Sequence, residues 1–327
     1  MIAYNVFSLY QSHEGLIQQQ TKLGHRKNTG SLTITPDNRT SIKIYKGIVM
    51  IIDFHTHIFP PDIREKRENF FNDEPAFKLL YSLPNSRLSG FDELIRNMDT
   101  EGVDKSVVFG FPWKTEDYFK KNNDFVMEAV EKNKDRLIGF ATFFPTAKNV
   151  ERELERCLKA GISGVGELAF YTSTISDDSL KRLKPVAEIA TKADIPILLH
   201  TNETIGHYYP GKTSITLKEI FNFLKYFPDN KIILAHWGGG ILFYCLMKKI
   251  VKEVLKNTWF DTAASPYLYE KKIYTVATQI VDPGRILFGS DFPLLKPGRY
   301  FKEMKESGLP DTTIKKICGD NARLLLA

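Results

Sequence analysis

The stretch MIIDFHTH at residues 50–57 reads as a short apolar β-strand that ends in alternating ionisable residues. Side chains two residues apart lie on the same face of a strand, so Asp53, His55 and His57 point the same way. Two imidazoles at this spacing can bind one cation through neutral ring nitrogens. A lone His-x-His pair is more often a pair of surface histidines, so the interpretation depends on what ends the later strands.

A strand followed by a helix repeats along the chain after residue 51. Apolar strands are predicted at 51–57, 106–111, 137–143, 162–167, 195–200, 231–236, 258–261 and 285–291. Helices are predicted at 91–102, 122–134, 149–160, 179–193, 216–227, 241–256 and 267–281, with a long charged loop up to about residue 88. Eight such units predict an α/β protein with a (β/α)₈ TIM barrel, and a doubly wound open sheet is the structural alternative.

Residues 1–49 form a polar N-terminal extension, and the barrel domain is expected at 50–327. The extension is predicted to contain a short hairpin at 31–35 and 41–45 or to be disordered. Six basic and two acidic residues give it a charge of +4 out of the +6 of the whole chain. The remaining 278 residues carry only +2. This is no electrostatic footprint for a nucleic acid, so we expect a small-molecule substrate.

Several features predict a cytoplasmic protein without a membrane segment. No apolar run approaches the roughly 20 residues that cross a bilayer, and the N-terminus lacks the pattern of a secretory signal. The three cysteines, Cys157, Cys245 and Cys318, are far apart and fit reduced thiols.

Ionisable residues stand at the carboxyl ends of five predicted strands: His55 and His57, Glu167, His200, His236 and Asp291. A barrel brings these ends together at one face, where active sites of this architecture lie. Each residue alone has an ordinary explanation, such as a core histidine, an ion pair or a helix cap. Together they form a ligand set for zinc, manganese, iron or cobalt, with zinc favoured and at least one position open to water.

The ordered motifs resemble the amidohydrolase superfamily, in particular the amidohydrolase-related branch that includes aminocarboxymuconate semialdehyde decarboxylase. They are DFHTH at 53–57, LH at 199–200, AHWGG at 235–239, FGSDFP at 288–293 and ICGDNARLL at 317–325. The resemblance covers about 50–327 and implies a metal-dependent enzyme that holds one or two divalent ions. It also implies a homodimer as an expectation.

The resemblance implies a role for each residue of the set. His55, His57, His200 and Asp291 would bind the metal, and Asp291 would also take a proton from water. His236 would polarise the substrate or transfer a proton. Many relatives with two metals carry a carboxylated lysine where this chain has Glu167, which would be a further ligand and favours hydrolysis.

Two reactions therefore stay open. The first is hydrolysis of a small-molecule amide, ester or lactone by metal-activated water, which makes the chain a metal-dependent hydrolase. The alternative is non-oxidative decarboxylation of a small aromatic or unsaturated acid, the activity of a lyase. Five residues in loops after the strands are expected to contact the substrate: Trp113, Asn202, His207, Trp237 and Arg299.

Overall fold

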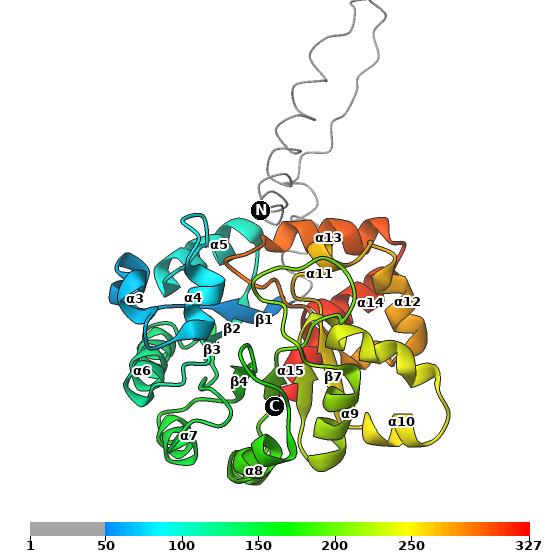
Figure 1. Cartoon of the computed structure of the whole chain (residues 1–327). Helices are drawn as coiled ribbons and strands as arrows, with labels where there is room; N and C mark the ends of the chain where they lie inside the picture. Colours follow the sequence, from blue (N-terminus) through cyan, green and yellow to red (C-terminus); the bar gives the residue numbers. More distant parts are fainter. Residues whose placement is uncertain (1–49) are drawn as a thin grey trace, which may run out of the picture. The chain divides into compact units, whose positions relative to one another are not determined.

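Eight parallel strands lie side by side around a barrel in the computed structural model, which describes residues 50–327 (Figure 1). They are β1 (Ile52–His57), β2 (Lys105–Phe109), β3 (Leu137–Gly139), β4 (Val165–Leu168), β5 (Ile197–Leu199), β6 (Ile232–Leu234), β7 (Thr258–Asp261) and β8 (Ile286–Leu287). The strands pair in sequence order within two runs, β1 to β3 and β4 to β8. The hairpin predicted at 31–35 and 41–45 lies outside the described residues.

Backbone hydrogen bonds close the barrel at the two junctions between these runs. The amide of Ala141 donates to the carbonyl of Gly164 at 2.9 Å, next to an isolated parallel bridge between Ala141 and Val165. On the other side, the amide of Phe54 donates to the carbonyl of Phe288 at 2.7 Å. The predicted barrel is therefore confirmed, because closure joins β8 back to β1.

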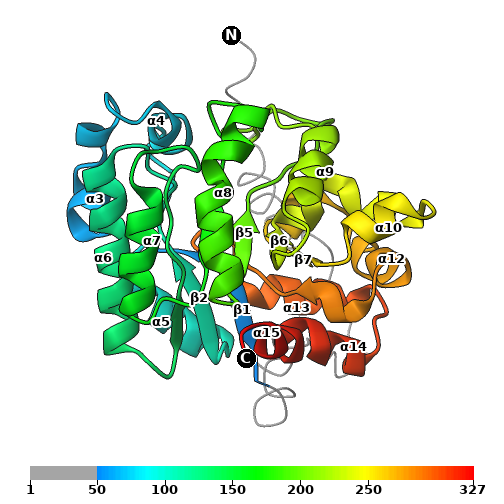
Figure 2. The same ribbon diagram turned by 90° about the horizontal axis from the view of Figure 1, so that it is seen from below.

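Helices surround the strands, as Figure 2 shows from below. They are α5 (Phe91–Glu101), α6 (Glu116–Lys132), α7 (Val150–Lys159), α8 (Asp177–Lys192), α9 (Leu217–Tyr226), α12 (Ile273–Ile280) and α13 (Pro297–Glu306). Local chemistry fixes where α9 begins. The hydroxyl of Thr216 accepts the amide of Glu219 at 3.2 Å, and the Glu219 carboxylate accepts the amide of Thr216 at 2.7 Å. This reciprocal capping box satisfies amides that have no partner within the helix.

The structure corrects three of the predicted segments. The loop expected up to about residue 88 contains α3 (Pro61–Glu65), η1 (Arg67–Phe70) and α4 (Pro75–Tyr81). The helix expected at 241–256 is instead η2 (His236–Leu246) followed by α10 (Ile250–Val254). Met247 is extended and Lys249 has a positive φ of 56°, so one α-helix cannot run from 241 to 256. The helix expected at 267–281 is divided into α11 (Ser265–Leu268) and α12.

The barrel interior is closed at its amino-terminal end by the last helix. The chain ends in α14 (Asp311–Lys315), the short η4 (Lys316–Asp320) and α15 (Asn321–Leu325). Side chains of α15 pack with apolar residues that point inward from the strands, among them Ile52, Phe54, Leu198 and Ile233. The carboxyl ends of the strands then form the other end of the barrel, where the ionisable residues lie. Among residues 50–327, no helix is both long enough and apolar enough to span a membrane.

Candidate metal centre

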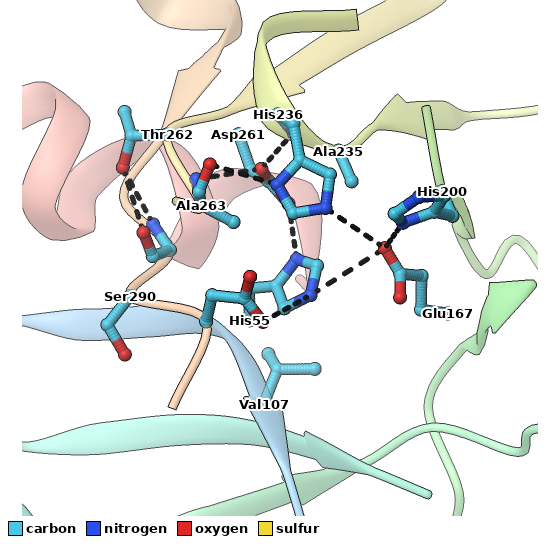
Figure 3. Close-up of polar contacts among 12 residues, drawn as sticks. His55, Val107, Glu167, His200, Ala235, His236, Asp261, Thr262, Ala263 and Ser290 are labelled. Atoms are coloured by element: carbon cyan, nitrogen blue, oxygen red, sulfur yellow. Dashed lines mark hydrogen bonds and ion pairs between the residues drawn. The ribbon is translucent and has the colours of Figure 1, made fainter. Parts of the chain in front are cut away.

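Four histidines and two carboxylates converge at the carboxyl ends of the strands. Figure 3 shows the side chains of His55, His200 and His236 turned toward Glu167. His55 and His57 lie at the end of β1, and Glu167 lies in β4. His200, His236 and Asp291 stand within four residues after the ends of β5, β6 and β8. We call these six residues the cluster. The structure therefore brings together the six strand-end residues that the sequence indicated.

Short distances join the cluster atoms. Nε2 of His55 lies 3.2 Å from Nε2 of His57 and 3.6 Å from Oδ1 of Asp291. Oε1 of Glu167 lies 3.0 Å from Nδ1 of His200, 3.6 Å from Nε2 of His236 and 3.7 Å from Nε2 of His55. The centre of the cluster is buried, since the side chains of His55 and Glu167 are 0% and 2% exposed, whereas His57 and Asp291 are 12% and 16% exposed.

The other ring nitrogen of each histidine faces a hydrogen-bond acceptor outside the cluster. A backbone carbonyl can only accept, so it fixes the proton on the ring nitrogen that faces it. The four pairs are Nδ1 of His55 with Oδ2 of Asp261 (2.8 Å), Nδ1 of His57 with O of Gly110 (3.2 Å), Nε2 of His200 with O of Gly211 (3.0 Å) and Nδ1 of His236 with O of Ala263 (2.9 Å). In the neutral tautomers, four nitrogen lone pairs therefore point into the cluster.

This arrangement fits a divalent cation. Lone pairs of imidazole and carboxylate groups face one another at 3.0–3.7 Å, and neutral histidines place no hydrogen atom between them. Such a set is repulsive unless a cation or extra protons occupy its centre. Two overlapping groups offer ligand atoms within 4.8 Å of one another: His55, His57 and Asp291, and His55, Glu167 and His236.

The pKa values reveal the same excess of negative charge. Burial lowers the pKa of His55, but the carboxylates of Asp261 and Glu167 outweigh burial and raise it to about 10. The pKa of His236 rises to about 9, because Glu167 and Asp291 likewise outweigh burial. Burial raises the pKa of Asp291, yet the histidines outweigh it and lower the pKa to about 2. Protons on the histidines are thus the alternative to a bound cation.

Asp261 at the end of β7 is a residue that the sequence analysis did not include in the set. Its side chain is fully buried, and Oδ2 accepts the proton of Nδ1 of His55 at 2.8 Å. Its Oδ1 accepts the amides of His236 at 2.8 Å and Ala263 at 3.0 Å. Asp261 therefore orients two cluster histidines at once. The rule that found the other residues could have found it, because it is the ionisable end of a predicted strand.

Asp53 shares the strand face of His55 but lies outside the cluster. Its Oδ1 accepts the amide of His55 at 3.2 Å and that of Ser290 at 2.8 Å, so it ties β1 to the segment after β8. Burial raises its pKa to about 7, although these hydrogen bonds act in the opposite direction.

Three residues predicted to contact the substrate have buried side chains whose polar groups are already paired. Trp113 and Trp237 have no accessible surface, and their indole N–H groups donate to Asn122 and Ser265, both at 2.9 Å. Oδ1 of Asn202 accepts the amide and hydroxyl of Thr213 at 2.8 and 2.7 Å. Burial gives these three side chains a packing role in this structure, and their contact with a substrate stays a prediction.

The remaining two predicted contact residues are His207 and Arg299, and their contact with a substrate stays a prediction. His207 is exposed in the loop between β5 and α9. Arg299 on α13 donates to Oε1 of Glu303 at 3.2 Å and to the carbonyl of Pro266 at 2.9 Å. Within the described part of the chain, neither side chain forms a hydrogen bond or ion pair with a cluster residue.

Two tyrosines that the sequence analysis missed belong to a run of aromatic rings that reaches the cluster. The ring centroid of Tyr171 is 5.0 Å from that of His200. Burial raises the pKa values of Tyr81 and Tyr171, and the carboxylates of Glu167 and Asp291 raise them further. Tyr81 ends α4, inside the segment that was expected to be a loop, so no pattern placed it near the strand ends.

Solved structures with a similar fold include two decarboxylases and one probable hydrolase. The 5-carboxyvanillate decarboxylase of Sphingomonas paucimobilis is 16% identical, with a TM-score of 0.69 over 85% of this chain and 99% of its own. A dihydroxybenzoic acid decarboxylase of Polaromonas, with bound manganese and the inhibitor 2-nitroresorcinol, is 19% identical, with a TM-score of 0.65 over 85% and 97%. A probable 2-pyrone-4,6-dicarboxylic acid hydrolase of Acinetobacter baumannii is 15% identical, with a TM-score of 0.57 over 84% and 98%. At these identities the likeness shows the barrel fold alone.

A comparison with curated protein sequences finds no match. The sequence profile of the amidohydrolase family, in contrast, matches residues 52–327, which is most of the chain and all of the barrel. The matched segment begins at β1 and contains every residue of the cluster. The chain therefore belongs to the amidohydrolase family, as its motifs predicted.

Proposed function

We propose that this protein is a metal-dependent hydrolase of small-molecule amides, esters or lactones. The observation that carries this proposal is that two carboxylates approach the same ring nitrogen. Nε2 of His55 lies 3.7 Å from Oε1 of Glu167 and 3.6 Å from Oδ1 of Asp291. One carboxylate can hold the ion while the other also transfers protons, which is the division of work that hydrolysis by activated water requires.

The ligands in this proposal are the inward-facing atoms of five residues: His55, His57, Glu167, His200 and Asp291. Neutral imidazole with carboxylate suits zinc, and the same donors also suit manganese, iron and cobalt. A bound divalent ion would supply Lewis acidity, which makes water easier to deprotonate and a carbonyl group more electrophilic.

Accessibility supports Asp291 as the proton-transfer group. Its side chain is 16% exposed, whereas that of Glu167 is 2% exposed, so Asp291 is the carboxylate within reach of water and substrate. Asp291 would take a proton from the attacking water and deliver it to the leaving group. His236, whose Nδ1–H is held by Ala263 and whose pKa is raised to about 9, would in its doubly protonated form donate Nε2–H to the oxygen that gains negative charge.

Decarboxylation of a small aromatic or unsaturated acid is the second candidate. Two of the similar structures are decarboxylases of substituted benzoic acids, and one of them holds manganese. In this reaction His236 would supply the proton that replaces the carboxyl group.

The two reactions can be separated by their products. We would load the full chain with zinc or manganese, measure acid release from a panel of lactones and esters with a pH indicator, and measure amine release from amides with an amine-reactive dye. In parallel, carboxyl-labelled ¹³C aromatic acids would be followed for ¹³CO₂ by mass spectrometry. We expect acid release that falls at least about a hundredfold in Asp291→Asn, because one proton-transfer group contributes about 10²–10⁴ in rate. The control is Asp178→Asn, since Asp178 is 81% exposed on α8. Release of ¹³CO₂ without any hydrolysis would reject the hydrolase in favour of the decarboxylase.

A further inference from the structure

A continuous run of aromatic rings leads from α4 to the cluster. Tyr81 contacts Phe111 edge to face, with ring centroids 6.0 Å apart. Phe111 in turn stacks on Tyr171, with centroids 5.7 Å apart and an angle of 5° between the rings. Tyr171 then lies 5.0 Å from the ring of His200. Segments far apart in the sequence thus place Tyr171 against a cluster histidine and Tyr81 in the same run of rings.

Phe111 fixes these two tyrosines in position. Its side chain is buried, and the preceding carbonyl, that of Gly110, accepts Nδ1–H of His57. The segment that holds a cluster histidine therefore also carries the ring against which both tyrosines pack. Tyr81 is held further by Phe77 and Phe59, at centroid distances of 4.8 and 5.5 Å. Such packing restricts the motion of both rings and so orients their hydroxyls.

Neither hydroxyl has a partner in the described part of the chain. No hydrogen bond joins the phenol oxygen of Tyr81 or Tyr171 to another residue between 50 and 327, whereas the hydroxyl of Tyr209 donates to Glu203 at 2.9 Å and that of Tyr300 to the carbonyl of Ser290 at 2.7 Å. The ring of Tyr171 contacts that of His200, and Tyr81 is joined to Tyr171 through Phe111. A phenol is a neutral donor at physiological pH, so each hydroxyl can bind an acceptor without adding charge.

We propose that Tyr81 and Tyr171 are positioning residues that donate hydrogen bonds to oxygen atoms of an organic anion held at the cluster. The substrate, or the acid that forms from it, would thus carry a carboxylate or similar oxygen acceptor beside a planar group. This inference rests on the proposed function, because it assumes that the cluster is the active site. The inference adds that one tyrosine of α4, Tyr81, and one tyrosine after β4, Tyr171, recognise the substrate.

Binding of salicylate to the manganese-loaded full chain tests this inference. Salicylate is a planar anion with oxygen acceptors, and calorimetry gives its Kd without turnover. We would compare the wild type with Tyr81→Phe and Tyr171→Phe, which keep the ring and its packing and remove only the hydroxyl. Tyr226→Phe is the matched control, since Tyr226 lies at the end of α9 and is 41% exposed.

Loss of a hydrogen bond to a charged acceptor predicts a Kd about tenfold to a hundredfold higher for each of the two variants. Manganese content and Tm should stay at wild-type values, because neither residue belongs to the proposed ligand set. A Kd within twofold of the wild type in both variants would reject the positioning role, and so would a wild type that does not bind salicylate. If the hydrolysis assay fails but the wild type binds salicylate and both variants bind it more weakly, only the proposed reaction is rejected.

Discussion

Replacing Asp261 with asparagine should weaken metal binding although Asp261 is not itself a proposed ligand. The carboxylate accepts the proton of Nδ1 of His55 at 2.8 Å and the amides of His236 and Ala263 at 2.8 and 3.0 Å. In Asp261→Asn, the amide oxygen can still accept the two backbone amides. The NH₂ group would then face Nδ1 of His55, and a donor there forces the ring proton onto Nε2. That proton would point into the cluster, where a lone pair is needed.

The expected loss follows from the geometry of this single bond. Changes to groups that orient ligating histidines typically cost about tenfold to a hundredfold in metal affinity, equivalent to about 1.4–2.8 kcal/mol. The site is fully buried, so water cannot replace the lost acceptor, and we expect the upper half of this range.

Competition with a coloured chelator at pH 8 would measure the affinity for zinc and manganese. The comparison is among wild type, Asp261→Asn and the exposed control Asp178→Asn, with circular dichroism to confirm that each is folded. An affinity of Asp261→Asn within twofold of the wild type would refute the argument that this carboxylate fixes the tautomer of His55.

Further predictions follow from the cluster, a buried acid and two glycines. Glu167→Gln should lower metal content from about two ions per chain to about one if Glu167 bridges two ions, and an unchanged content, measured by elemental mass spectrometry, would exclude a bridge. In metal-free protein at pH 8, zinc binding should release at least one proton per ion, because the pKa of His55 is about 10. Calorimetry in buffers of different ionisation enthalpy measures this release. A binding heat that does not depend on the buffer would contradict the prediction. Burial raises the folded-state pKa of Asp53 to about 7 from an ordinary value of 3.8. The contribution of Asp53 to the free energy of unfolding is therefore fully present below pH 3.8. It falls by on the order of 4 kcal/mol as the pH rises to about 7. In metal-free protein, Asp53→Asn should therefore raise Tm relative to the wild type more at pH 8 than at pH 5, and an equal difference at both values would contradict this. Gly239→Ala should lower Tm much more than Gly161→Ala. Both glycines have positive φ, but only the new Cβ at 239 would meet a backbone atom, the carbonyl oxygen of Asn202 at 2.3 Å. Equal losses of Tm in the two variants would contradict this.

The sequence was sufficient to predict the barrel and the cluster because both depend on simple periodic rules. Apolar strands alternating with helices predict a parallel sheet, and ionisable residues at strand ends meet when that sheet closes. The same rule would have included Asp261. Side chains in a strand end are placed by the strand itself, so no long-range information was needed.

The features that the sequence did not predict depend on contacts between distant segments. The carbonyls of Gly110, Gly211 and Ala263, which fix three histidine tautomers, carry no signal in side-chain type. The burial of Trp113 follows from packing against aromatic rings of α4 and η1, in a region expected to be a loop. Tyr81 joins the run of rings that leads to the cluster for the same reason, and only the fold of that segment places it there.

Metal content per chain, measured by elemental mass spectrometry, tests most directly whether the cluster is a metal centre. We predict at least one divalent ion per wild-type chain after loading and desalting, and the same content in Asp178→Asn. His200→Ala and Asp291→Ala should stay folded and lose most of the bound metal. Full occupancy in both alanine variants, or a wild type that takes up no zinc, manganese, iron or cobalt, would contradict the assignment of the cluster as the metal centre.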